Sequence, residues 1–210
     1  MTLTGYNTVD LKEMLEELGE EKTKKILLTF SCPYNEDVEY FLHHKAIEFS
    51  KQQLSNTFLV VCSHKGLTAF IGYFTIADKV ISLTGKHNFS NRLRSRISKF
   101  ATYHSELKAY LVSAPLIGQL GKNYSNNFNT LISGDELLQI ACDKIREAQR
   151  ILGGKIVYLE CEDTIHLKNF YERNGFYEFG KRLIEDDELN KGKYLIKMIK
   201  YLIWILKWLN

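Results

Sequence analysis

The sequence predicts a single α/β domain in which a mixed sheet is flanked by helices. Two strand-like runs surround the turn Lys65-Gly66, and a long helical pattern from Gly134 to Leu152 is followed by a further β-rich run. Strands and helices in this alternation are typical of α/β domains. With 210 residues, of which 45% are hydrophobic and 25% charged, the chain is long enough for one packed core. We therefore expect one domain over residues 1–210, with its core at about residues 30–200.

The first element that we expect is a helix over about residues 8–25. Apolar residues are spaced there among acids and lysines as on the packing face of a helix. They are Val9, Met14, Leu15 and Leu18. The same region is acidic rather than basic and carries no apolar run, so the sequence predicts no secretory signal and a cytoplasmic protein.

A second helix is expected from Asn35 to about Gln53, followed by two strands. Residues 57–63 and 68–76 are rich in β-branched and aromatic side chains, and Lys65-Gly66 between them is a turn signal. We therefore expect these two strands to form a hairpin.

Basic side chains are concentrated between residues 86 and 99, where no acid occurs. They are Lys86, Arg92, Arg94, Arg96 and Lys99, with aromatic residues in or beside the run. Such a segment suits a phosphate backbone with bases stacked on the rings, and tRNA is a candidate partner. A solvated surface explains the same pattern, because the formal net charge is only +3.

The clearest helix of the sequence begins after Ser133 and ends before Gly153-Gly154. Its apolar residues recur at helical spacing, and its acids and bases lie at the ends that the helix dipole favours. The β-rich run 155–161 follows as a strand. A last helix is expected from about Thr164, a suitable N-cap, to Gly175.

The C-terminal segment has two interpretations. As one helix, residues 193–210 would align four lysines in a stripe and resemble a membrane-surface anchor. We favour a strand from Tyr194 to about Lys200, because a short run of β-branched and aromatic residues follows Asn190-Lys191-Gly192. Membrane contact is then not expected, and the apolar tail 201–210 suits self-association, including a homodimer, as well as lipid contact.

Two features of the helices suggest chemistry. A helix that opens at Gly134 after a small-residue loop presents unpaired backbone N–H groups and a positive dipole end, which suit a phosphate. Tyr171, on the next helix, is a candidate proton donor. From the residues alone, an aromatic ring that packs under the sheet is the better explanation of Tyr171.

These segments resemble the GCN5-related N-acetyltransferase (GNAT) superfamily. Residues 129–134, followed by Leu137-Leu138, resemble its pyrophosphate loop Gln/Arg-x-x-Gly-x-Gly/Ala. Residues 170–176 resemble its Tyr-x-x-x-Gly-Phe pattern. Residues 116–123 look like its fourth strand, and residues 35–42 resemble the start of the toxin-like branch, which acetylates aminoacyl-tRNA.

The resemblance implies a mixed, mostly antiparallel sheet with a splayed parallel pair of strands at the cofactor site. It implies direct attack of a primary amine on acetyl-CoA in a ternary complex, with Tyr171 as the general acid and Glu160 or a water chain as the base. Residues 35–49 and 86–111 would form the acceptor pocket. The cofactor would be bound by Leu120, Gly121, Lys122, Leu131, Ile132, Ser133, Gly134, Asp135, Thr164 and Arg173, and some of the arginines near residue 94 would reach its 3′-phosphate.

The sequence departs from the family at several of these positions. Asn129 and Ile132 replace the first loop residue and a loop glycine, Asp135 places a carboxylate beside the expected phosphate, and Thr164 stands where many relatives have asparagine. The alternative is therefore a GNAT-fold module with a degenerate loop that binds nucleic acid or a protein partner without catalysis.

Other chemistries lack their patterns in this sequence. The four cysteines show no C-x-x-C spacing and the histidines no H-E-x-x-H spacing, so no metal is expected. The G-x-S-x-G elbow of hydrolases and the complete phosphate-binding P-loop motif are also missing.

Overall fold

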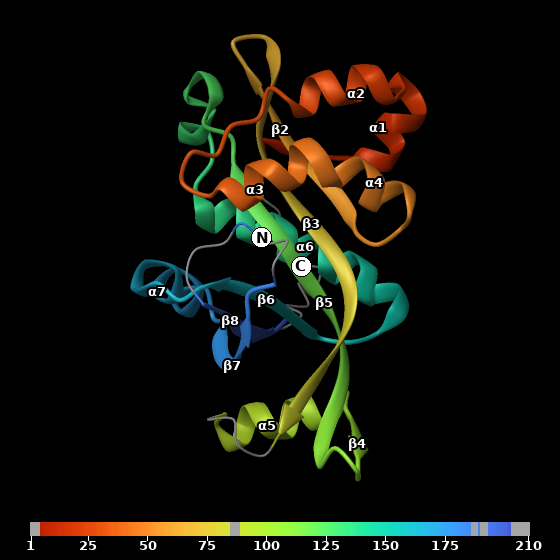
Figure 1. Ribbon diagram of the computed structural model, residues 1–210, viewed down its shortest axis with the longest axis vertical. Coiled ribbons are helices and arrows are strands. Elements are labelled where there is room, and N and C mark those ends of the chain that lie inside the picture. The colour runs from red at the N-terminus through yellow and green to blue at the C-terminus, as the bar shows by residue number, and fades with distance from the viewer. Residues whose placement is uncertain (1–4, 85–88, 186–188, 190–192, 203–210) are drawn as a thin grey trace, which may run out of the picture.

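The computed structural model describes residues 5–84, 89–185, 189 and 193–202. Within them, the strands form one sheet in the order β1-β2-β3-β5-β6-β8-β7, with β4 paired to β5 (Figure 1). The strands are β1 (Tyr6–Asp10), β2 (Asn56–His64), β3 (Leu67–Thr84), β4 (Thr102–His104), β5 (Ala109–Lys122), β6 (Ile156–Glu162), β7 (Tyr177–Leu183) and β8 (Tyr194–Tyr201). The helices are α1 (Leu11–Leu18), α2 (Glu20–Leu27), α3 (Glu36–Tyr40), the π-helical η1 (Phe41–Lys45), α4 (Ala46–Lys51), α5 (Asn91–Ser98), the 3₁₀-helical η2 (Ser125–Thr130), α6 (Gly134–Leu152) and α7 (Ile165–Arg173).

The pairing of the strands confirms the predicted fold class. Neighbouring strands are antiparallel throughout the order above, except that β5 and β6 are parallel. The hairpin of β2 and β3 turns at Lys65 and Gly66, both at positive φ, as the twist of a tight two-residue turn requires. The C-terminal segment is the strand β8, as predicted, whereas residues 203–210 lie outside the described part of the chain.

The single helix predicted for residues 8–25 is wrong. Residues 6–10 form β1, which pairs with β2, and the helical part consists of α1 and α2. The Asp10 carboxylate caps α1 by accepting a hydrogen bond from the Lys12 N–H at 2.8 Å. Gly19, at φ 78°, then ends α1 and begins α2. The cap and the glycine together override the helical spacing that the sequence shows.

The helix predicted from Asn35 to Gln53 is present as α3, η1 and α4, which follow one another without a break. The side chain of Asn35 caps it at the Val38 N–H. The π-helical segment was not predicted. With α1 and α2, these helices cover one face of the sheet around a buried cluster (Figure 1). That cluster includes Leu11, Leu27, Phe30, Leu42, Leu59 and Tyr73.

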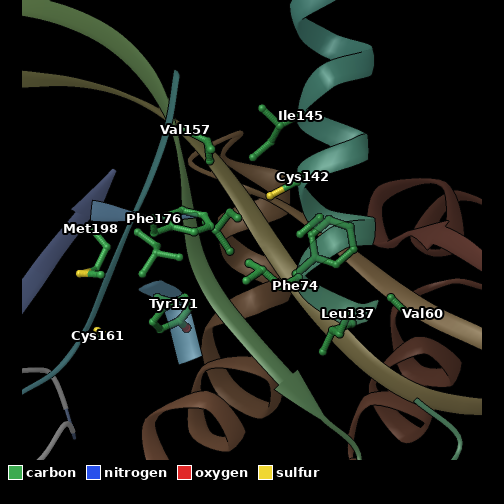
Figure 2. Packing of buried hydrophobic residues seen from close by; sticks show 14 of the residues in the cluster. Val60, Phe74, Leu137, Cys142, Ile145, Val157, Cys161, Tyr171, Phe176 and Met198 are labelled. Atoms are coloured by element: carbon green, nitrogen blue, oxygen red, sulfur yellow. The ribbon is translucent and has the colours of Figure 1, made fainter. Parts of the chain in front are cut away.

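The helices α6 and α7 share a second cluster (Figure 2). Its buried members include Val60, Phe74, Leu137, Cys142, Ile145, Val157, Tyr171, Phe176 and Met198. The helix α6 confirms the helix that was predicted from the most strongly periodic segment of the sequence. Two sets of helices thus enclose the middle of the sheet, with α3 in one cluster and α7 in the other.

The strands β3 and β5 are longer than predicted and extend together as an arm (Figure 1). The helix α5 covers the arm through Leu93 and Ile97, which pack with Ile81 and Val112 in a third cluster. The basic run of the sequence therefore lies mostly on α5. In the part of the chain that the structure describes, no helix is long and apolar enough to cross a membrane.

Candidate functional site

The strands β5 and β6 separate near the middle of the sheet. They pair only at Leu116 with Tyr158 and at Ile117 with Leu159, although β5 continues to Lys122 and β6 to Glu162. Backbone groups of β5 beyond Ile117 consequently have no ladder partner on β6. This is the splayed parallel pair that the family resemblance implied.

The part of β5 beyond the separation point is fixed by its neighbours. The Gln119 N–H donates to Thr75 Oγ1 on β3 at 2.8 Å, where the ladder of β3 and β5 has a bulge. Lys122 Nζ donates to the Asn129 carbonyl at 3.0 Å, which ties the end of β5 to the following loop. Leu120 is half-buried against the core of α6 and α7.

Gly121 allows α3 to lie close to β5. A Cβ atom at this position would be 2.5 Å from Val38 Cγ1 and 3.3 Å from Phe30 Cζ, which is closer than carbon atoms pack. The glycine is thus needed for the contact between β5 and α3. Its backbone remains part of the strand that was predicted to bind pantetheine.

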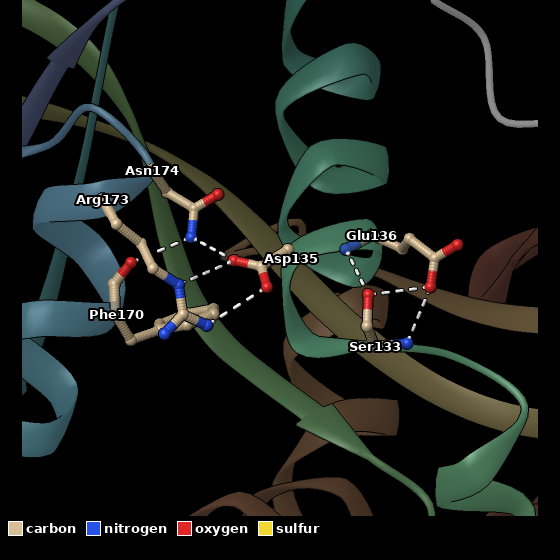
Figure 3. Close-up of polar contacts among 6 residues, drawn as sticks. All are labelled: Ser133, Asp135, Glu136, Phe170, Arg173 and Asn174. Carbon is tan, nitrogen blue, oxygen red and sulfur yellow. Dashed lines mark hydrogen bonds and ion pairs between the residues drawn. The ribbon is translucent and has the colours of Figure 1, made fainter.

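Side chains at the start of α6 cap its N-terminus (Figure 3). Ser133 Oγ accepts the Glu136 N–H at 3.1 Å, and Glu136 Oε2 accepts the Ser133 N–H at 2.8 Å, so the two residues form a capping box. The hydroxyl of Tyr6 donates to Glu136 Oε1 at 3.2 Å and to the Leu131 carbonyl at 3.1 Å. The hydrogen bonds from Ser133 and Tyr6 lower the pKa of Glu136.

Asp135 turns toward α7 instead of Tyr6 (Figure 3). Its carboxylate accepts hydrogen bonds from Arg173 Nη2 at 3.1 Å and from Asn174 Nδ2 at 2.6 Å. Arg173, followed by Asn174, lowers the pKa of Asp135. Figure 3 shows Asp135 and Glu136 on opposite sides of the helix start. Hydrogen bonds therefore hold both carboxylates of the first turn at the sides of the helix start.

Ile132 and Gly134 have packing roles in the loop. Ile132 is buried in the core of α6 and α7, where a glycine would leave a cavity. A Cβ atom on Gly134 would be 3.2 Å from the Phe170 ring, so this glycine lets α7 approach the start of α6. Arg173 lies over the same Phe170 ring, 5.0 Å from its centroid.

Tyr171 is buried between the separating strands. Figure 2 shows its ring between β5 and β6, and it packs edge-to-face against Phe176 with 5.8 Å between ring centroids. Burial, with a smaller contribution from Cys161, raises the pKa of Tyr171 well above its usual value. Among the described residues, no hydrogen bond of its hydroxyl is found. Burial thus favours the protonated form of the Tyr171 phenol.

Three further residues near the strands, Thr164, Glu160 and Cys161, have structural surroundings that account for them. Thr164 is the N-cap of α7 and accepts the Leu167 N–H at 3.3 Å. The Glu160 carboxylate accepts from Arg182 Nε, and this ion pair makes Glu160 a poor candidate for the base. Burial raises the pKa of the Cys161 thiol to about 12, so this cysteine is not a nucleophile.

The basic residues of α5 lie far from the start of α6. Gly72 on β3 pairs with Lys122, and the arm that α5 covers begins near Ile81, which is about 30 Å farther along the strand. The 3′-phosphate interpretation of these arginines is therefore not supported. Arg92 and Arg94 are exposed, Arg96 lies 5.3 Å from the centre of the Tyr201 ring, and Lys86 is outside the described residues.

Sequence reasoning missed Asp37 and Tyr6. The Asp37 carboxylate lies against β5 and accepts a hydrogen bond from Gln119 Nε2 at 2.8 Å. Residues 35–49 were expected to contribute to an acceptor pocket, but no spacing in the sequence links Asp37 to Gln119. Tyr6 was missed because the sequence did not predict the strand β1 over Tyr6–Asp10. In the described residues, no group of acids, histidines and cysteines is arranged to bind a metal.

The fold is similar to that of several solved structures. A tyrosine-to-phenylalanine variant of KacT has a TM-score of 0.58 at 14% identity, with 92% of this chain and 94% of that chain covered. AtaT complexed with acetyl-methionyl-tRNAfMet has a TM-score of 0.59 at 14% identity, with 91% and 93% covered. AtaTR bound with AcCoA has a TM-score of 0.53 at 14% identity, with 92% and 93% covered.

These comparisons show that the chain has the GNAT fold. No family model matches the sequence, and no curated protein matches it. The similarity is therefore one of structure.

Proposed function

We propose that this chain is an acetyl-CoA-dependent N-acetyltransferase that acts on the amino group of aminoacyl-tRNA. The observation that carries the proposal is the arrangement of Tyr171 between β5 and β6, which separate just beyond Ile117. The toxin AtaT, which has the same fold, has been solved with acetyl-methionyl-tRNAfMet, and AtaTR with AcCoA. These complexes support both the co-substrate and the acceptor.

Acetyl-CoA would follow β5 and end at the start of α6. Its pantetheine arm would bind the unpaired edge of Leu120, Gly121 and Lys122, because a strand without a partner offers backbone donors and acceptors. Its pyrophosphate would bind backbone N–H groups within residues 131–135, at the positive end of the helix dipole. Two N–H groups in this range already have acceptors, since Leu131 donates to the Phe128 carbonyl and Ser133 to Glu136 Oε2, so the phosphate would use the others or displace Glu136. The outward positions of Asp135 and Glu136 support this placement, since neither carboxylate lies on the helix axis.

In the reaction, the acceptor amine attacks the thioester carbonyl carbon, and the carbon–sulfur bond breaks. Tyr171 then donates its proton to the departing thiolate. Burial raises the pKa of Tyr171. Desolvation in the same apolar surroundings also raises the pKa of the departing thiol, so the proton transfer does not become less favourable because the phenol is buried. The attacking nitrogen must lose a proton to a base.

The first test is calorimetric titration of acetyl-CoA into the protein. We expect saturable binding in the micromolar range. Absence of any binding heat at millimolar acetyl-CoA would contradict the proposal. Reverse-phase detection of acetylated amino acid released from charged tRNA then tests the acceptor.

A second candidate function is a binding module that has kept the fold without catalysis. The capping box favours it, because Glu136 already occupies the Ser133 N–H that a phosphate would otherwise use. The exposed arginines of α5 would then bind RNA alone. Binding of tRNA without any binding of acetyl-CoA would support this candidate over the first.

A further inference from the structure

One charged side chain at the separation point has no role in the transfer described above. Asp37, in the first turn of α3, accepts hydrogen bonds from Gln119 Nε2 at 2.8 Å and from the Leu189 N–H at 3.2 Å. Gln119 lies two residues beyond Ile117, where the ladder of β5 and β6 ends. The carboxylate of Asp37 is thus held at the place where the two strands part.

Within the described ranges, Asp37 has no ion-pair partner. Both of its donors are uncharged, and no lysine or arginine of the described residues forms an ion pair with it. Glu36 and Glu39 lie in the same first turn and add negative charge, and Glu39 is bonded to the Cys32 N–H. A half-buried carboxylate with neutral partners attracts a cation, because desolvation without a counter-charge is costly.

Asp37 and Tyr171 approach the strands from opposite faces. Tyr171 belongs to the cluster of α6 and α7, whereas α3 packs in the cluster of α1 and α4. A thioester between the strands would therefore have the proton donor on one face and the carboxylate on the other. An amine that adds to the thioester carbonyl from the face opposite Tyr171 would arrive on the side of Asp37.

We propose that Asp37 binds the ammonium group of the acceptor amine, with Gln119 holding the carboxylate in place. The α-amino group of an aminoacyl ester is partly protonated near neutral pH, so a carboxylate at this place selects a cationic amine and retains it for deprotonation. This inference rests on the proposed acetyl transfer. It adds the acceptor side of the site, which the cofactor residues leave unassigned.

The test is Asp37→Asn, which removes the charge while keeping the shape of the side chain. A mixture of charged tRNAs and labelled acetyl-CoA serve as substrates. We expect the apparent KM for charged tRNA to rise roughly tenfold or more, because hydrogen bonds between charged groups are stronger than neutral ones. We expect the Kd for acetyl-CoA to stay within about twofold, and Asp37→Glu to recover part of the loss. Asp78→Asn is the matched control, since Asp78 is an exposed carboxylate bonded to Ser113 Oγ on the arm.

Each outcome decides the inference. If the wild-type protein acetylates charged tRNA and Asp37→Asn has the same KM and kcat, the inference is overturned while the proposed function stands. If Asp37→Asn lowers the melting temperature and acetyl-CoA affinity together, its role is structural and the inference is also overturned. If the wild-type protein binds acetyl-CoA but transfers nothing to any charged tRNA, the proposed function fails and the inference fails with it.

Discussion

Tyr171 illustrates how burial sets the chemistry of a single residue. Its pKa is raised chiefly because the apolar core excludes the phenolate, so the acid form persists above the usual value of about 10. The protonated phenol is the form that a departing thiolate needs. A free tyrosine on the surface would supply the same group without holding it between the strands.

The raised pKa of Tyr171 gives a prediction for pH dependence. Because activity requires the protonated phenol and its pKa is raised, loss of the donor begins only above about pH 10. The ratio of transfer rates for wild type and Tyr171→Phe should therefore be constant from about pH 7 to pH 9.5. Single-turnover rates at saturating substrates measure this ratio, in which other titrating groups cancel. A ratio that falls through pH 8 or 9 would mean that the pKa is lowered instead.

Arg173 has a different task at the residue scale, because it neutralises the Asp135 carboxylate next to the expected phosphate. We predict that Arg173→Gln weakens acetyl-CoA binding about threefold to tenfold, since the unpaired carboxylate then repels the phosphate. The double variant with Asp135→Asn should recover most of this loss in calorimetry. Lys181→Gln, which breaks the comparable surface pair with Asp163, serves as the control and should leave binding unchanged.

The result for the double variant separates two roles of Arg173. Recovery means that the arginine acts by neutralising Asp135. A double variant that binds as weakly as Arg173→Gln would mean that Arg173 contacts the cofactor itself.

At the scale of elements, the start of α6 depends on its cap. Replacing an N-cap serine by alanine costs about 1 kcal/mol. Here the change removes both hydrogen bonds between Ser133 Oγ and Glu136, while the backbone N–H of residue 133 still donates to Glu136. We predict that Ser133→Ala lowers the free energy of unfolding by about 1 kcal/mol and weakens acetyl-CoA binding.

The control for this prediction is Ser90→Ala, which removes the equivalent cap of α5 at the Leu93 N–H. It should have a similar effect in urea denaturation and none on acetyl-CoA binding. Equal loss of cofactor binding in both variants would show that stability, and not the local cap, explains the effect.

The contact of α3 with β5 gives a further prediction at this scale. The methyl group of Gly121→Ala would overlap Val38, so we expect a loss of about 1–3 kcal/mol in the free energy of unfolding. Val38→Ala makes room for that methyl group. The double variant should therefore be less destabilised than the sum of the single variants, as measured by urea denaturation. Additive losses would contradict the overlap.

At the scale of the molecule, the sequence predicted the sheet and its main helices because their patterns are local. The helical spacing of α6, the turn at Lys65-Gly66 and the cap at Thr164 each fix an element without distant contacts. The family resemblance added the parallel pair of strands, which no periodicity indicates.

The arrangements that the sequence did not predict depend on distant contacts. The strand β1 forms because β2 offers it an edge, and the long arm exists because β3 and β5 continue to pair beyond the core. The contact of Asp37 with Gln119 spans 82 positions of the chain. Such contacts are set by tertiary packing, and local propensity does not encode them.

The arm gives the molecule a second charged region beyond the separating strands. We predict that Arg92→Gln and Lys99→Gln each weaken tRNA binding. Each should also reduce the slope of log K against log salt concentration by about one, because each removes one phosphate contact. Filter binding at several salt concentrations measures both quantities. Lys51→Gln, at the end of α4 and paired with Glu20, should change neither. Binding that does not respond to salt would contradict an electrostatic role for α5.

The central claim is that this chain moves an acetyl group from acetyl-CoA to aminoacyl-tRNA with Tyr171 as the proton donor. The most direct measurement is the transfer of label from acetyl-CoA to charged tRNA by the wild-type protein and by Tyr171→Phe, with the acetyl-CoA affinity of both proteins determined in parallel. We expect the wild type to transfer label, and Tyr171→Phe to bind acetyl-CoA equally well while its turnover falls about a hundredfold or more. Equal turnover by the two proteins, or no transfer by the wild type, would contradict the claim.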